Sequence, residues 1–222
     1  MKFYKNYQIL ALFIALSASS YSYAGTNPSI AQLKIYGVGV ANNADCSNAT
    51  IVGLNSTGTT FDMLMNPTIV RGSVAAGTYN CIILIMDATV TFTPATGATG
   101  SCTAGTSYGR VLCQTGCSYT AYTVDANNLA VYGGSTPSTA ASSADLANAP
   151  KVMLFLSTSS VGNGMNAFLK PGTGVWSNGL PLLAPLTVSA TGSTGTFVTN
   201  FDGQVNGNGG TCDLIQPSFT FR

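Results

Sequence analysis

Residues 77–94, which read GTYNCIILIMDATVTFTP, decide the fold class of this chain. The uninterrupted apolar run from Cys81 to Met86 is typical of a strand that is buried on both faces. The alternation Thr91-Phe92-Thr93 that follows is typical of a strand with only one face in a core. We therefore predict a central β-strand over residues 77–93, with a half-buried second part.

Other segments carry shorter strand patterns. In residues 33–40, a period of two assigns Leu33, Ile35, Gly37 and Gly39 to one face of a strand. Tyr36, Val38 and Val40 then share the other face with Lys34. Further strand candidates, separated by spacers rich in Gly, Asn, Ser and Pro, are residues 59–64, 118–124, 151–158, 183–191, 195–201 and 212–221.

Many short strands with frequent turns predict an all-β fold, namely a disulfide-stabilised β-sandwich of the Ig-like or prealbumin-like kind. At most one short helix is expected, near residues 138–149, where Ala is abundant. We predict one β-sandwich domain over residues 25–222. The irregular zone 133–150 leaves a division into two β-subdomains as the alternative.

The N-terminus predicts export. Lys2 and Lys5 precede an apolar run, residues 9–16, and a stretch of small residues that ends at Ala24. This order is typical of a secretory signal peptide, here residues 1–24. The run is too short to span a membrane, and no later stretch approaches ~20 apolar residues. We expect the mature chain to be secreted, periplasmic or at the cell surface, with no membrane span.

The composition argues against an enzyme. The chain has no His, and all seven of its acidic residues are Asp. Without Lys2 and Lys5, six cationic and seven anionic side chains remain, a net charge of −1. Such a chain lacks the usual proton-transfer groups and a basic stripe for nucleic acid. Gly105-Thr106-Ser107-Tyr108-Gly109 matches the nucleophile elbow of hydrolases, but no imidazole is present to activate Ser107.

All the cysteines lie in the predicted mature chain, at Cys46, Cys81, Cys102, Cys113, Cys117 and Cys212. An even number in an exported chain predicts up to three disulfides. Cys46 and Cys81 are one expected pair, because both flank extended segments. Cys212 must reach back to Cys102, Cys113 or Cys117, and the sequence does not choose among these. Zinc is the alternative for Cys113 and Cys117, although no His is available as a further ligand.

The segment Ser73-Val74-Ala75-Ala76-Gly77-Thr78-Tyr79, which leads into the long apolar strand, resembles a turn of transthyretin-like (prealbumin-like) modules in bacterial envelope proteins. The resemblance covers about residues 30–93. It implies a surface or secreted scaffold and brings no catalytic residues.

One segment has the spacing of a calcium loop. Oxygen-bearing side chains alternate at Asp202, Gln204, Asn206 and Asn208, and Asp213 stands at the twelfth position. Gln204 departs from the usual ligand types, and the twelfth position prefers Glu. A hairpin loop rich in Gly and Asn explains the same residues without metal. Apart from this calcium candidate, no cofactor is expected.

We predict a non-enzymatic structural or self-assembling protein of fibre or envelope type. Its expected partners are further copies of itself or other envelope proteins, because low charge gives little resistance to association. The alternative is an adhesive, glycan-binding module. The aromatic side chains that would stack on a sugar are Trp176, Tyr108, Tyr119 and Tyr122. A core position is the other interpretation of Trp176.

Overall fold

The computed structural model describes residues 25–67, 69, 74–112, 131–132, 151–162, 167–190, 192–193, 196–208 and 210–222. Over these residues the chain forms β-strands and one 3₁₀ turn, so the predicted disulfide-stabilised all-β fold is confirmed. The signal peptide 1–24, the strand 118–124, the helix 138–149 and the boundary zone 133–150 lie outside the described residues.

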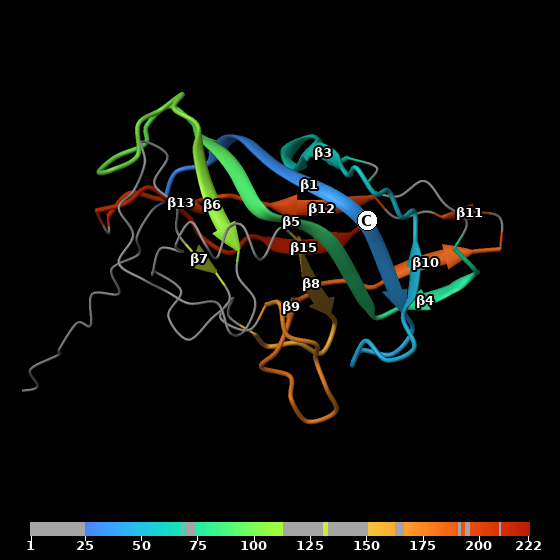
Figure 1. Ribbon diagram of the computed structural model, residues 1–222. Helices are drawn as coiled ribbons and strands as arrows, with labels where there is room; N and C mark the ends of the chain where they lie inside the picture. Colours follow the sequence, from blue (N-terminus) through green and yellow to red (C-terminus); the bar gives the residue numbers. More distant parts are fainter. Residues whose placement is uncertain are drawn as a thin grey trace, which may run out of the picture.

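Two long antiparallel strands, β1 and β5, form the middle of the largest sheet (Figure 1). β2 and β3 pair with the outer edge of β1. β8 and β6 pair with successive halves of β5, and β9 and β7 add to them in parallel. The strands of this sheet are β1 (Pro28–Ala41), β2 (Thr50–Val52), β3 (Thr59–Asp62), β5 (Cys81–Pro94), β6 (Tyr108–Leu112), β7 (Val131–Tyr132), β8 (Lys151–Ser157) and β9 (Leu180–Pro181).

A β-bulge in β1 changes which side chains face the core. Ile35 pairs with Met86 and Gly37 pairs with Ile85, so Tyr36 is an extra residue in β1. A bulge moves the alternation by one position, so the side chains beyond it exchange faces. Ala31, Leu33 and Ile35 before the bulge and Val38 and Val40 after it therefore belong to one buried cluster.

The predicted faces of residues 33–40 are correspondingly wrong. The sequence placed Gly37 and Gly39 with Leu33 and Ile35, but the bulge turns the two glycines to the opposite face of the sheet. A strict period of two cannot reveal such an insertion, because the bulge is set by pairing with β5 and not by the sequence of β1 alone.

The segment that was expected to be one strand over 77–93 divides at Asn80. β4 (Gly77–Tyr79) pairs with β10 in the second layer, whereas β5 belongs to the large sheet. The Asn80 side-chain amide donates a hydrogen bond to the carbonyl of Asn42 (2.8 Å). The chain thus crosses from one layer to the other at this residue.

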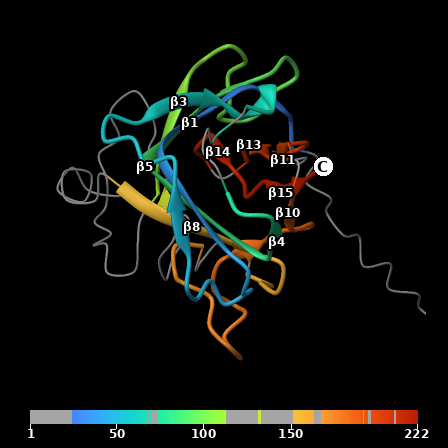
Figure 2. The same cartoon turned by 90° about the vertical axis from the view of Figure 1, so that its right-hand side faces the viewer.

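The second layer consists of short strands that lie beside the large sheet (Figure 2). β10 pairs with β11 and β4, β12 pairs with β15, and β13 pairs with β14, all antiparallel. A parallel bridge between Leu182 and Phe219 connects β15 to the chain that follows β9. The strands other than β4 are β10 (Leu186–Ser189), β11 (Gly192–Ser193), β12 (Phe197–Asn200), β13 (Val205–Asn206), β14 (Asp213–Leu214) and β15 (Ser218–Phe221).

Two of the predicted strands are shortened or divided in the structure. Residues 59–64 were predicted as a strand, but β3 stops at Asp62 and the 3₁₀ turn η1 (Met63–Met65) follows. The Asp62 carboxylate accepts a hydrogen bond from the N–H of Leu64 (3.1 Å), which caps this turn. The predicted strand 212–221 is divided into β14 and β15, and Pro217, which has no N–H, lies just before β15.

The core lies between the two layers. Its largest fully buried side chains include Phe92, Met63, Ile82, Leu84 and Met86. The predicted disulfide Cys46–Cys81 is present, and Cys102 is the partner of Cys212. The first bond joins the loop after β1 to the start of β5, and the second joins the loop after β5 to the residue before β14. Cys113 and Cys117 lie outside the described residues.

Candidate functional site

The outer face of the large sheet, which points away from the core, carries exposed apolar side chains. Leu54 is 69% exposed, Met153 45% and Ile51 41%, and Ile85 is partly exposed. They come from β2, the loop after it, β5 and β8. We call these four residues, with Gly37 and Gly39 between them, the outer apolar stripe.

Strand register places the members of the stripe side by side. Gly37 pairs with Ile85, which pairs in turn with Met153 on β8. Gly39 pairs with Ile51 on one side and with buried Ile83 on the other. A Cβ at Gly37 would lie 3.4 Å from Cγ of Leu54 and 3.6 Å from Cδ1 of Ile85, so these two side chains flank a position without one. Leu54 and Ile85 thus lie over Gly37, and Ile51 and Ile83 lie over Gly39, so both glycines are buried beneath apolar side chains of this face.

A small second cluster covers the end of this face. Cys46, Cys81, Ala41, Ile83 and Phe155 pack together there, separately from the main core. The disulfide holds the loop 42–49 against the sheet, and the Ser157 hydroxyl donates to the carbonyl of Ala44 (2.6 Å). This loop leaves the neighbouring stripe uncovered.

Polar groups border the stripe at the bulge. The Tyr36 hydroxyl donates a hydrogen bond to a carboxylate oxygen of Asp87 (3.2 Å), and Lys34 Nζ lies 5.4 Å from the centroid of the Tyr36 ring. An apolar centre with a polar border is the usual anatomy of a protein interface.

Asp45 lies in the loop that covers the second cluster. Hydrogen bonds from the Ser47 hydroxyl and the Ser47 N–H hold the pKa of the Asp45 carboxyl below its usual value, and the positive charge of Lys170 adds to this. The carboxylate is fully exposed and caps a turn, because one of its oxygens accepts from the Ser47 N–H at 2.9 Å. The Asp45 carboxylate therefore helps to fix the conformation of this loop.

The predicted calcium segment includes the hairpin of β13 and β14, and the side chains of Asp202, Asn206 and Asp213 accept hydrogen bonds within the chain. Asp202 accepts from the Asn27 side chain (3.2 Å), and Asn206 accepts from the N–H of Asn208 (3.0 Å). Asp213, which pairs with Asn206 across β13 and β14, accepts from the Thr211 hydroxyl (2.7 Å). The side-chain amide of Gln204 donates to the carbonyl of Asp202 (3.1 Å).

These contacts are those of a polar hairpin, and calcium binding here stays a sequence-based prediction. Among the described residues, no group of three or more His, Cys, Asp or Glu side chains is arranged to hold a metal ion.

The aromatic residues proposed for a glycan site have different positions. Tyr108 is only 5% exposed, its ring stacks on Phe92, and its hydroxyl accepts from the N–H of Thr103 (2.9 Å). It is a core residue and takes no part in a surface site. Trp176 is partly exposed in the loop between β8 and β9, where its carbonyl accepts from the N–H of Val161 (2.8 Å). Tyr119 and Tyr122 lie outside the described residues.

The C-terminal strand β15, Ser218-Phe219-Thr220-Phe221, is paired within the chain. β15 pairs with β12 along its length, and the carbonyl of Phe219 also accepts from the N–H of Leu183 (2.9 Å).

Comparison with protein-family models, with curated proteins and with solved structures finds no match to this chain. In the part of the chain that the structure describes, no helix is long and apolar enough to cross a membrane. The two disulfides indicate an oxidising, non-cytoplasmic environment.

Sequence reasoning missed the outer apolar stripe. Its signal was weak, because Met153 stands in the continuous apolar run of residues 152–156, and Ile51 and Leu54 stand in a turn-rich segment. The alternation placed Gly37 and Gly39 as a pair on one face, which was the available clue, but the bulge had to be known before that face could be assigned to the side away from the main core.

Proposed function

We propose that the mature chain is an exported, non-enzymatic structural subunit of a cell envelope or an extracellular layer, and that it associates with further copies of itself. The outer apolar stripe carries this proposal. A sheet face with exposed Leu54, Met153 and Ile51 is suited to contact with another protein surface.

The occupant that fits best is a second copy of the same face. The four side chains of the stripe are all apolar, so none carries a charge that would repel its own image. Two equivalent faces related by a two-fold axis form a self-complementary contact. A strongly charged partner would find little to pair with, since the whole chain has only 7% charged residues.

The size of the stripe predicts weak pairwise affinity. Four side chains contribute far less than the roughly 800 Å² per partner that a stable interface buries. A dimer through this face should therefore be in rapid exchange, and strong assembly requires repeated contacts in a layer or fibre, where multivalency raises the effective concentration. This fits a subunit that acts collectively.

Sedimentation velocity of the mature chain at several concentrations tests the proposal. We expect reversible, concentration-dependent association that Leu54→Lys and Met153→Lys each weaken about tenfold or more, because each places a charge in the apolar contact. Leu183→Lys is the matched control, since Leu183 is equally exposed (67%) but lies in the chain between β9 and β10. A monomer at all concentrations, or equal loss of association in all three variants, would refute the proposal.

Glycan binding through Trp176 is a second candidate, favoured by one observation. Trp176 is partly exposed and follows exposed Val175, and the Ser160 hydroxyl, which donates to the Asn178 carbonyl (2.8 Å), holds the neighbouring backbone. Trp176 is the single tryptophan of the chain, so its fluorescence reports on this site. Saturable quenching of the Trp176 fluorescence by a glycan, together with loss of binding to that glycan on an array in Trp176→Ala, would support this function. Absence of binding to any glycan on the array would exclude it.

A further inference from the structure

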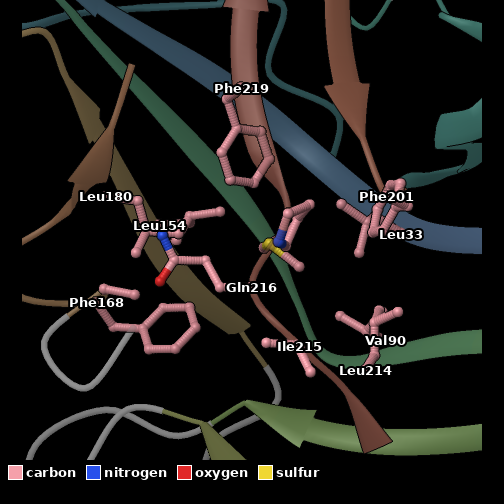
Figure 3. A pocket seen from close by; sticks show the side chains of 13 residues that line it. Leu33, Val90, Leu154, Phe168, Leu180, Phe201, Leu214, Ile215, Gln216 and Phe219 are labelled. Carbon is pink, nitrogen blue, oxygen red and sulfur yellow. The ribbon is translucent and has the colours of Figure 1, made fainter. Parts of the chain in front are cut away.

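A partly open cavity of about 80 Å³ lies between the two layers of the sandwich. Leu33 and Leu154 of the large sheet and Leu214 and Phe219 of the second layer line this cavity (Figure 3), and Met86 of the large sheet lines it as well. All five of these side chains are buried. The cavity is therefore a space within the core region that these side chains do not fill.

The surface that the cavity presents is entirely apolar. A water molecule there would lose the two to four polar partners that it needs, whereas an apolar group would lose nothing and would fill the space. Even Gln216, whose side chain extends toward Leu154 and Leu180 in Figure 3, contributes no polar surface to the cavity. The apolar lining of the cavity therefore favours a hydrocarbon group as its ligand.

The volume sets the size of the occupant. An apolar cavity of about 150 Å³ in another protein takes benzene, with six carbons, so about 80 Å³ corresponds to three or four carbons. An aromatic ring is too large for this space. The end of an unbranched alkyl chain has the right volume and the right shape.

The mouth lies at the link between β14 and β15. Ile215, Gln216 and Pro217 line the cavity and are more exposed than the walls, so they mark its solvent side. This link is outside any strand, and Pro217 has no N–H to hold it in a sheet. The remainder of a longer alkyl molecule would leave the protein past these residues.

We propose that this cavity is a binding site for the terminal propyl or butyl group of an unbranched alkyl chain. The site is separate from the outer apolar stripe, because its walls are the core-facing side chains of the same sheet. It adds ligand binding to a chain proposed above as a structural subunit, and it does not depend on self-association.

Titration of the methyl-labelled mature chain with primary alcohols from ethanol to 1-hexanol, followed by NMR, tests this. The methyl groups of Met86 and Leu154 should shift saturably. The dissociation constant should fall about fourfold for each carbon up to 1-butanol, which is the transfer free energy of one methylene, and then change little. Benzyl alcohol, with the same head group on a ring, should bind at least tenfold more weakly than 1-butanol.

The variant Ala167→Leu provides an independent test of the cavity as the binding site. Ala167 is buried and lines the cavity, so three added carbons should fill it and abolish the 1-butanol shifts. Ala76→Leu, the same change at an exposed position, should leave them unchanged. The proposal is overturned by the absence of saturable shifts, by affinity that rises evenly to 1-hexanol, by equal binding of benzyl alcohol, or by binding that persists in a folded Ala167→Leu variant. If that variant does not fold, the alcohol series on the unchanged protein decides alone.

Discussion

Removal of the Cys102–Cys212 bond should destabilise the protein more than removal of the Cys46–Cys81 bond. The two bonds close loops of 110 and 35 residues. In the chain-entropy model, a disulfide stabilises the fold by restricting the unfolded chain, and the effect grows with the logarithm of the loop length. For these loops the model gives about 5 and about 4 kcal/mol at 25 °C, a difference of about 1 kcal/mol.

The position of the bonds in the fold should enlarge this difference. Cys46–Cys81 fastens a loop to a sheet whose strands are also held by ladders of backbone hydrogen bonds. Cys102–Cys212 joins the two layers beside a close approach, where the N–H of Ser101 donates to the carbonyl of Gly207 (2.9 Å). All four cysteines are almost fully buried, so replacement by Ala leaves similar small voids in both cases.

The assay is urea unfolding of the mature chain and of the variants Cys102→Ala/Cys212→Ala and Cys46→Ala/Cys81→Ala. Replacement of both partners prevents a leftover thiol from pairing with Cys113 or Cys117. Far-ultraviolet circular dichroism and Trp176 fluorescence should give coincident transitions, which is the condition for comparing free energies of unfolding. An equal or larger loss for the Cys46–Cys81 variant would show that loop length does not control these bonds, and the reasoning would fail.

Two further predictions concern the outer face. A Cβ at Gly39 would lie 3.0 Å from Cδ1 of Ile51 and 3.2 Å from Cβ of Ile83, whereas at Gly37 the nearest atom is 3.4 Å away. Gly39→Ala should therefore lower the free energy of unfolding by about 1–3 kcal/mol, and Gly37→Ala by clearly less, as measured by urea unfolding; a reversed order would contradict the register described here. Because the pKa of Asp45 is lowered in the folded protein, ionised Asp45 stabilises the folded state at pH values above the ordinary carboxyl pKa. This stabilisation is lost as the pH falls through the lowered pKa. Ser47→Ala removes the hydroxyl and keeps the Ser47 N–H, so it should raise the Asp45 pKa toward 3.8 in an NMR titration of its carboxyl carbon. An unchanged titration would exclude the Ser47 hydroxyl as the main cause.

The alternation of residue types located most of the strands, because the pattern of a strand is set by residues that are close together in the sequence. Phe92 is buried between partly exposed Thr91 and Thr93, as the alternation required. The division at Asn80 was not predictable in the same way, since it depends on β4 finding β10, a segment more than 100 residues away. Cys46–Cys81 was found because both cysteines flank neighbouring extended segments, whereas the partner of Cys212 could not be chosen among three.

The same distinction between local pattern and tertiary structure applies to the candidate sites. The sequence directed attention to polar and aromatic residues, and the structure places Tyr108 in the core and the side chains of Asp202 and Asn206 in hairpin contacts. The stripe and the cavity consist of ordinary apolar residues, which carry no motif. Their roles depend on which face they occupy and on what lies opposite.

By itself, the sequence determined the all-β class, the use of disulfides and the poverty in proton-transfer groups, because these follow from residue types and local period. Tertiary structure alone decided that the bulge at Tyr36 turns Gly37 and Gly39 outward, that Cys102 meets Cys212, and that an apolar space remains between the layers. The physical reason is that strand register and the packing of two layers are set by pairing between residues that are far apart in the chain. Local sequence patterns carry no information about this pairing.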